Sequence, residues 1–81
     1  MNMEQLKLYI LSILIENADK LVIAPDLVID RLFDRLSVSV ASEIDGWRAM
    51  GRSDAYQVIW DRHLLPILAQ TDMFVKVFAR S

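Results

Sequence analysis

The sequence predicts an all-α fold, a small bundle or orthogonal array of about four helices. We also expect this domain to form a dimer. Three observations lead to this prediction. Apolar residues recur at helical spacing, two prolines and two glycines separate the segments, and 54% of the residues are hydrophobic. We find no repeat, linker or low-complexity stretch, so we expect residues 1–81 to form one helical domain.

The first expected helix covers residues 3–17, which are mostly strong helix formers. Apolar side chains occupy most of its circumference. A narrow polar stripe interrupts them, formed by Gln5, Ser12 and Glu16. A helix that is apolar nearly all round must be covered on more than one side. The cover is either the rest of this chain or a second copy that docks on Leu8, Leu11 and Ile15.

Residues 25–45 are expected to form a second helix, which starts at Pro25 because the fixed φ of proline suits a first helical position. Its apolar stripe continues to Ile44 and Trp47. The segment 37–40 is poor helix material, so fraying or a kink is expected there. Before this helix, residues 21–24 are ambiguous between helical and extended backbone. Gly46 and Gly51 are the candidate ends.

A third helix is expected to begin with Ser53 or Asp54 as its N-cap, and Gln57 completes a loose capping-box pattern with Asp54. Pro66 lacks an N–H and releases the carbonyl of Arg62, so a kink or break is expected there. Residues 73–78 are expected to form a last short helix, with an edge strand as the alternative.

Composition excludes several classes of protein. The chain has no cysteine, which excludes disulfides, thiolate zinc sites and cysteine nucleophiles and favours the cytoplasm. The longest apolar stretch, residues 6–15, is too short to span a bilayer, and the N-terminus lacks a signal-peptide pattern. The apolar content also argues against disorder.

Charge is distributed unevenly about a net value of −2. Residues 1–47 carry four basic and eight acidic groups, whereas residues 48–81 carry five basic and three acidic groups. We therefore expect any anionic partner to bind the C-terminal part of the chain.

The sequence indicates no catalytic chemistry. His63 is the only histidine, and we interpret it as a residue at the edge of the core with one hydrogen bond. No serine lies in a nucleophile elbow and no glycine-rich phosphate loop is present. We therefore expect no catalytic residue, no metal and no cofactor.

An acidic edge is predicted on the second helix, where Asp26, Asp30 and Asp34 repeat at a spacing of four residues. Arg31 and Arg35 lie one step round the helix and could neutralise them. The edge is then a solvated, salt-bridged face, or a docking strip for a basic partner, or, least favoured, a site for a divalent ion.

Three residues between and beside the glycines form a second candidate partner site: Trp47, Arg48 and Arg52. Tryptophan and arginine dominate the energetics of protein interfaces. In the alternative interpretation, Trp60 fills the core and Trp47 closes one end of the bundle.

The stretch from Met50 to Pro66 resembles the end of phage-type helix-turn-helix regulators, in which a glycine turn precedes a capped recognition helix that ends with a tryptophan and then a proline. Two positions depart from that pattern. Arg52 stands where an apolar residue is usual, and Gln57 falls on the internal packing position. The resemblance implies a small DNA-binding regulator whose basic and amide side chains face the duplex.

These observations favour a non-enzymatic, cytoplasmic protein that forms a homodimer, binds another protein and regulates or inhibits it. A domain of 81 residues has too little interior for so many apolar side chains, and the remainder is expected to meet another molecule. The alternative is the DNA-binding regulator described above. We do not expect a membrane partner.

Overall fold

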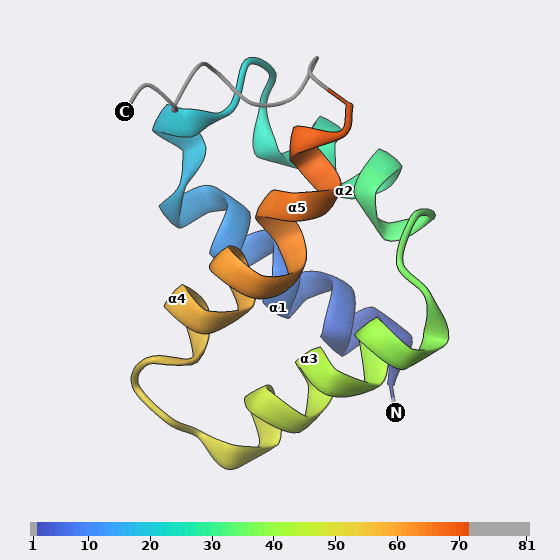
Figure 1. Cartoon of the computed structure of the whole chain (residues 1–81), viewed down its shortest axis with the longest axis vertical. Coiled ribbons are helices and arrows are strands. Elements are labelled where there is room, and N and C mark those ends of the chain that lie inside the picture. Colours follow the sequence, from blue (N-terminus) through green and yellow to red (C-terminus); the bar gives the residue numbers. More distant parts are fainter. Residues whose placement is uncertain (1, 72–81) are drawn as a thin grey trace.

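The computed structural model describes residues 2–71. Its helices are α1 (Met3–Glu16), η1 (Ala18–Lys20), α2 (Pro25–Phe33), α3 (Val38–Met50), α4 (Ala55–Ile59), η2 (Trp60–Leu64) and α5 (Leu65–Ala69) (Figure 1). η1 is a 3₁₀ turn and η2 is a π-helical turn. The all-α prediction is confirmed, because the described residues form helices and contain no strand. The prediction for residues 73–78 lies outside the described residues.

α1 begins at the predicted residue and ends at Glu16, one residue before the predicted end, and side chains pair some of its terminal backbone groups. The Oδ1 atom of Asn2 accepts hydrogen bonds from the backbone N–H groups of Glu4 and Gln5, at 3.0 and 3.1 Å. At the other end, the Asn17 amide donates to the carbonyl of Ile13 at 2.8 Å. Both asparagines thus stabilise the helix by pairing groups that lack an intrahelical partner.

The single helix predicted for residues 25–45 is wrong, because the structure divides this segment into α2 and α3. α2 ends at Phe33, and the Oγ atom of Ser37 accepts a hydrogen bond from the Val40 N–H at 3.1 Å to begin α3. A serine hydroxyl competes well for backbone groups at a helix start, so it begins a new helix here instead of continuing the old one. The segment before α2 is extended at Leu21, which is buried.

Of the two glycines predicted as candidate helix ends, only Gly51 ends a helix. Gly46 lies inside α3, so its prediction as a helix end is wrong. Gly51 ends α3 with a φ of 65°, in the left-handed region that glycine adopts at little cost. The stop therefore falls where the turn needs a left-handed residue.

The predicted disturbance at Pro66 takes the form of a π-helical turn just before it. The backbone N–H of Leu65 donates to the carbonyl of Trp60, five residues earlier. Pro66 has no N–H to donate to the Arg62 carbonyl. In the wider turn just before the proline, the Leu65 N–H pairs instead with a carbonyl five residues earlier. The predicted capping box at Asp54 is absent, because Asp54 makes no side-chain cap and Gln57 instead donates to Asp61 at 2.9 Å.

α1 supplies the centre of the hydrophobic core. Four of its side chains are fully buried: Leu6, Ile10, Ile13 and Leu14. α2 packs against α1, and the segment from α4 to α5 passes in front of α1 in Figure 1. Buried residues of these crossing elements complete the core, among them Leu32, Ile44, Ile59, Leu64 and Leu68. The arrangement is a crossed helical array rather than a bundle of parallel helices.

Candidate functional site

The outer face of α1, defined by Leu8, Leu11, Ser12 and Ile15, is an apolar surface that none of the elements described within residues 2–71 covers. Leu8 and Ile15 are 59% and 57% exposed, and Leu11 is half-buried. The only polar side chain on this face is already paired, since the Ser12 hydroxyl donates to the Leu8 carbonyl at 3.1 Å. Covering this face would therefore remove apolar surface from water, and the Ser12 hydroxyl would keep its hydrogen bond to the Leu8 carbonyl.

The structure splits the acidic edge of α2. Asp30 pairs with Lys7 of α1, with 3.2 Å between carboxylate oxygen and Nζ, and the same ammonium lies 5.9 Å from the centre of the Phe33 ring. Asp26 and Asp34 are exposed. Lys7 of the neighbouring helix α1 thus neutralises Asp30, the middle carboxylate of the edge. The spacing of residues within α2 does not predict this contact.

The corner around Trp47 brings together the three residues singled out in the sequence. Trp47 is half-buried against the core, and the guanidinium of Arg52 lies 5.1 Å from the centre of its ring. Each arginine also has a carboxylate partner at 2.9 Å, Asp45 for Arg48 and Asp54 for Arg52. This corner presents an aromatic ring with paired charges rather than an excess of positive charge.

His63 lies at the edge of the core, as the sequence predicted. Its side chain is 11% exposed, and its Nε2 atom lies 3.2 Å from a carboxylate oxygen of Glu43. The contact links α3 to η2 and gives the His63 side chain a polar partner within the protein. Trp60 is buried in the core, in agreement with the interpretation of that residue.

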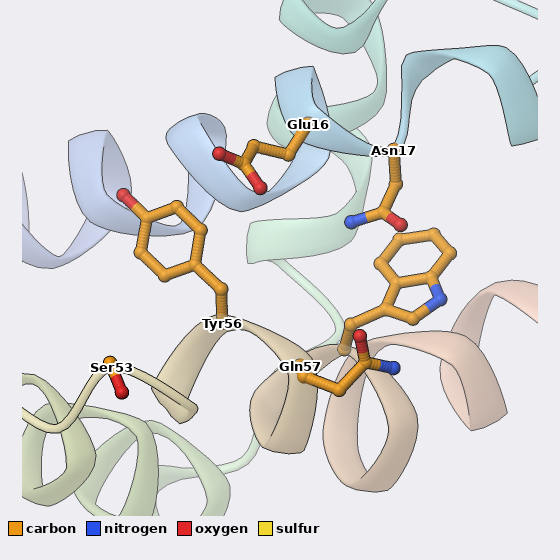
Figure 2. A pocket seen from close by; sticks show the side chains of 6 residues that line it. Glu16, Asn17, Ser53, Tyr56 and Gln57 are labelled. Atoms are coloured by element: carbon orange, nitrogen blue, oxygen red, sulfur yellow. The ribbon is translucent and has the colours of Figure 1, made fainter.

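The sequence did not indicate a pocket that lies between the end of α1 and α4. Its volume is about 220 Å³. It is lined by two residues at the end of α1 and by four residues between positions 53 and 60: Glu16, Asn17, Ser53, Tyr56, Gln57 and Trp60. Figure 2 shows the Tyr56 side chain extending from α4 towards α1. The last four lining residues recur at helical spacing, which is a signal the sequence contains. Their position opposite Glu16 depends on the crossing of the two helices, which the sequence does not show.

Beside this pocket, Tyr9 of α1 and Tyr56 of α4 meet edge to face. Their ring centres are 5.4 Å apart, with an angle of 82° between the planes. Burial raises the pKa of Tyr9 above its ordinary value of 10.0; the nearby Tyr56 raises it further, and Arg48 opposes the shift. The pair is a direct contact between α1 and α4, and its Tyr56 ring also lines the pocket.

Comparison with protein-family models, curated proteins and solved structures finds no match for this chain. Within residues 2–71, no three histidine, aspartate or glutamate side chains are placed to hold a metal ion. In the same residues no helix has the length and apolar character needed to cross a bilayer.

Proposed function

We propose that this protein is a non-enzymatic interaction module that forms a homodimer through the outer face of α1 and regulates or inhibits another protein by binding it. One observation carries the proposal. Leu8 and Ile15 expose more than half of their surface on a helix whose opposite face is fully buried. Contiguous apolar surface of this kind is typical of a binding site.

A second copy suits this face because the face is self-complementary. Leu8 and Ile15 lie two helical turns apart, with Leu11 and Ser12 between them. A two-fold axis through the centre of the face would place Leu8 of one copy against Ile15 of the other, as an isologous interface requires. Polar groups do not oppose this contact, because the Ser12 hydroxyl is satisfied within its own helix.

The test is the oligomeric state, measured by light scattering during size exclusion over a range of protein concentrations. We expect the unchanged protein to be a dimer, and the double variant Leu8→Asp with Ile15→Asp to be a folded monomer. Circular dichroism checks the fold of the variant, which should persist because both side chains are exposed.

Val38→Asp is the matched control, since Val38 is 81% exposed but lies at the start of α3. We expect this variant to remain a dimer. A protein that stays monomeric at every concentration would contradict the dimer, and a Val38→Asp monomer would place the contact on another face.

For the regulated partner, two surfaces away from the dimer contact are proposed: the acidic edge of Asp26, Asp30 and Asp34, and the corner of Trp47, Arg48 and Arg52. Asp26 and Asp34 are exposed carboxylates suited to a basic partner, and Trp47 offers an aromatic contact. Binding of the partner should weaken in the Asp26→Lys or Trp47→Ala variant, and undiminished binding in both variants would refute these surfaces.

The proposal places the protein in the cytoplasm, where a chain without cysteine is at no disadvantage.

The DNA-binding alternative is supported by one observation, the connection of α3 to α4 through the left-handed Gly51. The surrounding charges favour it less, because Arg48 and Arg52 are paired with carboxylates and Gln57 contacts Asp61. Duplex DNA binding titrated against salt distinguishes the two functions, since phosphate contacts make affinity fall steeply with salt. Binding that is strong at low salt and lost at high salt would favour the regulator.

A further inference from the structure

We propose that the pocket between the end of α1 and α4 binds an organic cation, through an ammonium or guanidinium group. The source of that group is either a small free amine or a basic side chain of another protein. This inference concerns a different surface from the outer face of α1 and does not require the dimer.

The charge at the pocket comes from Glu16. Its side chain makes neither a hydrogen bond nor an ion pair with the other described residues. The last turn of α1 contains no basic residue, so the carboxylate lies at the negative end of the helix dipole without a cation from that turn. Both features attract positive charge, and both repel an anion.

The remaining polar groups that line the pocket are rich in acceptors. The amide nitrogen of Gln57 donates to Asp61 at 2.9 Å, which leaves its carbonyl oxygen able to accept a hydrogen bond. The hydroxyl oxygen of Tyr56, whose side chain extends towards α1 in Figure 2, can accept as well. An ammonium or guanidinium has donors only, so it matches this lining better than a carboxylate or phosphate does.

Lys20 shows that the edge of this pocket accepts an ammonium. Its Nζ atom lies 3.0 Å from Oδ1 of Asn17 and 5.9 Å from the centre of the Trp60 ring. This geometry is that of a cation–π contact supported by an amide oxygen. Because Lys20 is exposed, it acts as an internal competitor that an external cation could displace.

Binding can be measured by NMR titration of the isotope-labelled full chain at constant ionic strength. The probes are methylammonium, the capped single residues N-acetyl-lysinamide and N-acetyl-argininamide, and N-acetyl-glutamine amide and N-acetyl-glutamate amide as neutral and anionic comparators. We expect saturable shifts of the Trp60 indole N–H and of the Glu16 and Ser53 amides with the cations only. Shifts with methylammonium indicate a free amine as ligand, whereas shifts with the capped residues alone indicate a protein side chain.

Three variants make the test specific. Glu16→Gln should weaken cation binding about threefold to fivefold, the effect of removing one exposed charge partner. Glu4→Gln, at the opposite end of α1, is the matched control and should leave binding unchanged. Lys20→Gln should strengthen cation binding, because it removes the competing ammonium.

Three results would overturn the proposal: no saturable shift with any cation, equal binding by Glu16→Gln, or weaker binding by Lys20→Gln. The last result would mean that Lys20 supports the bound ligand instead of competing with its cationic group. Cation binding should persist in the Leu8→Asp, Ile15→Asp variant, so failure of the dimer and failure of this site are separately visible.

Discussion

α1 and α3 are helices of similar length, 14 and 13 residues, but different interactions hold them in place. α1 buries four large side chains completely, whereas the buried residues of α3 are Ala41 and Ile44. α3 has a serine cap at its start, a left-handed glycine at its end and half-buried residues such as Trp47 packed against the core. The comparison indicates that burial dominates the stability of α1, while local backbone interactions at the ends contribute a larger share in α3.

The largest expected effect tests the burial of α1. Leu14→Ala should lower the free energy of unfolding by about 2–5 kcal/mol, because it removes a fully buried side chain and leaves a cavity. Met3→Ala is the matched control on the same helix, because its side chain is 51% exposed and lies outside the proposed dimer contact; it should change stability by less than about 0.5 kcal/mol. Denaturant unfolding of both variants measures the difference. Equal losses would contradict the dominance of burial in α1.

A smaller effect tests the end of α3. Gly51→Ala should lower the free energy of unfolding by about 1–2 kcal/mol, because a side chain disfavours the positive φ at that position. Gly46→Ala is the paired variant within the same helix. It should raise stability by about 0.5–1 kcal/mol, since no atom lies within 4 Å of the added Cβ and alanine favours a helix interior. Thermal unfolding would contradict this account if both changes had the same sign.

The smallest effect is a pH dependence that arises where α1 meets α4. The pKa of Tyr9 is raised above 10.0 in the folded protein, so its contribution to stability is fully present below about pH 10. That contribution is lost as the pH rises through the raised pKa, because the unfolded chain releases the proton first. Tyr9→Phe should make the free energy of unfolding less dependent on pH between about pH 9 and about pH 11.

Phenolate absorbance checks the same point directly. In the Tyr56→Phe variant Tyr9 is the only tyrosine, so its titration can be followed alone. A midpoint at or below 10.0 would show that Tyr9 is not in the buried environment described for it.

The surfaces proposed here as binding sites were predicted from the sequence to different extents. The pattern of α1 placed Leu8, Leu11 and Ile15 on one side, and no element within residues 2–71 covers that side. The acidic edge was predicted from spacing along α2, but its pairing with Lys7 depends on how α2 packs against α1. The pocket was missed because Glu16 and Trp60 are distant in the sequence and meet only where two helices cross.

The sequence by itself determined that the chain is helical and where α1 lies, because helix propensity, apolar spacing and proline and glycine positions are local properties of the chain. It missed the end of α2, although the serine that caps α3 is also a local feature. Only the tertiary structure decided which face of α1 is buried by the described elements and which side chains share a pocket. Those outcomes depend on packing between segments that are far apart along the chain, and no local pattern specifies that packing.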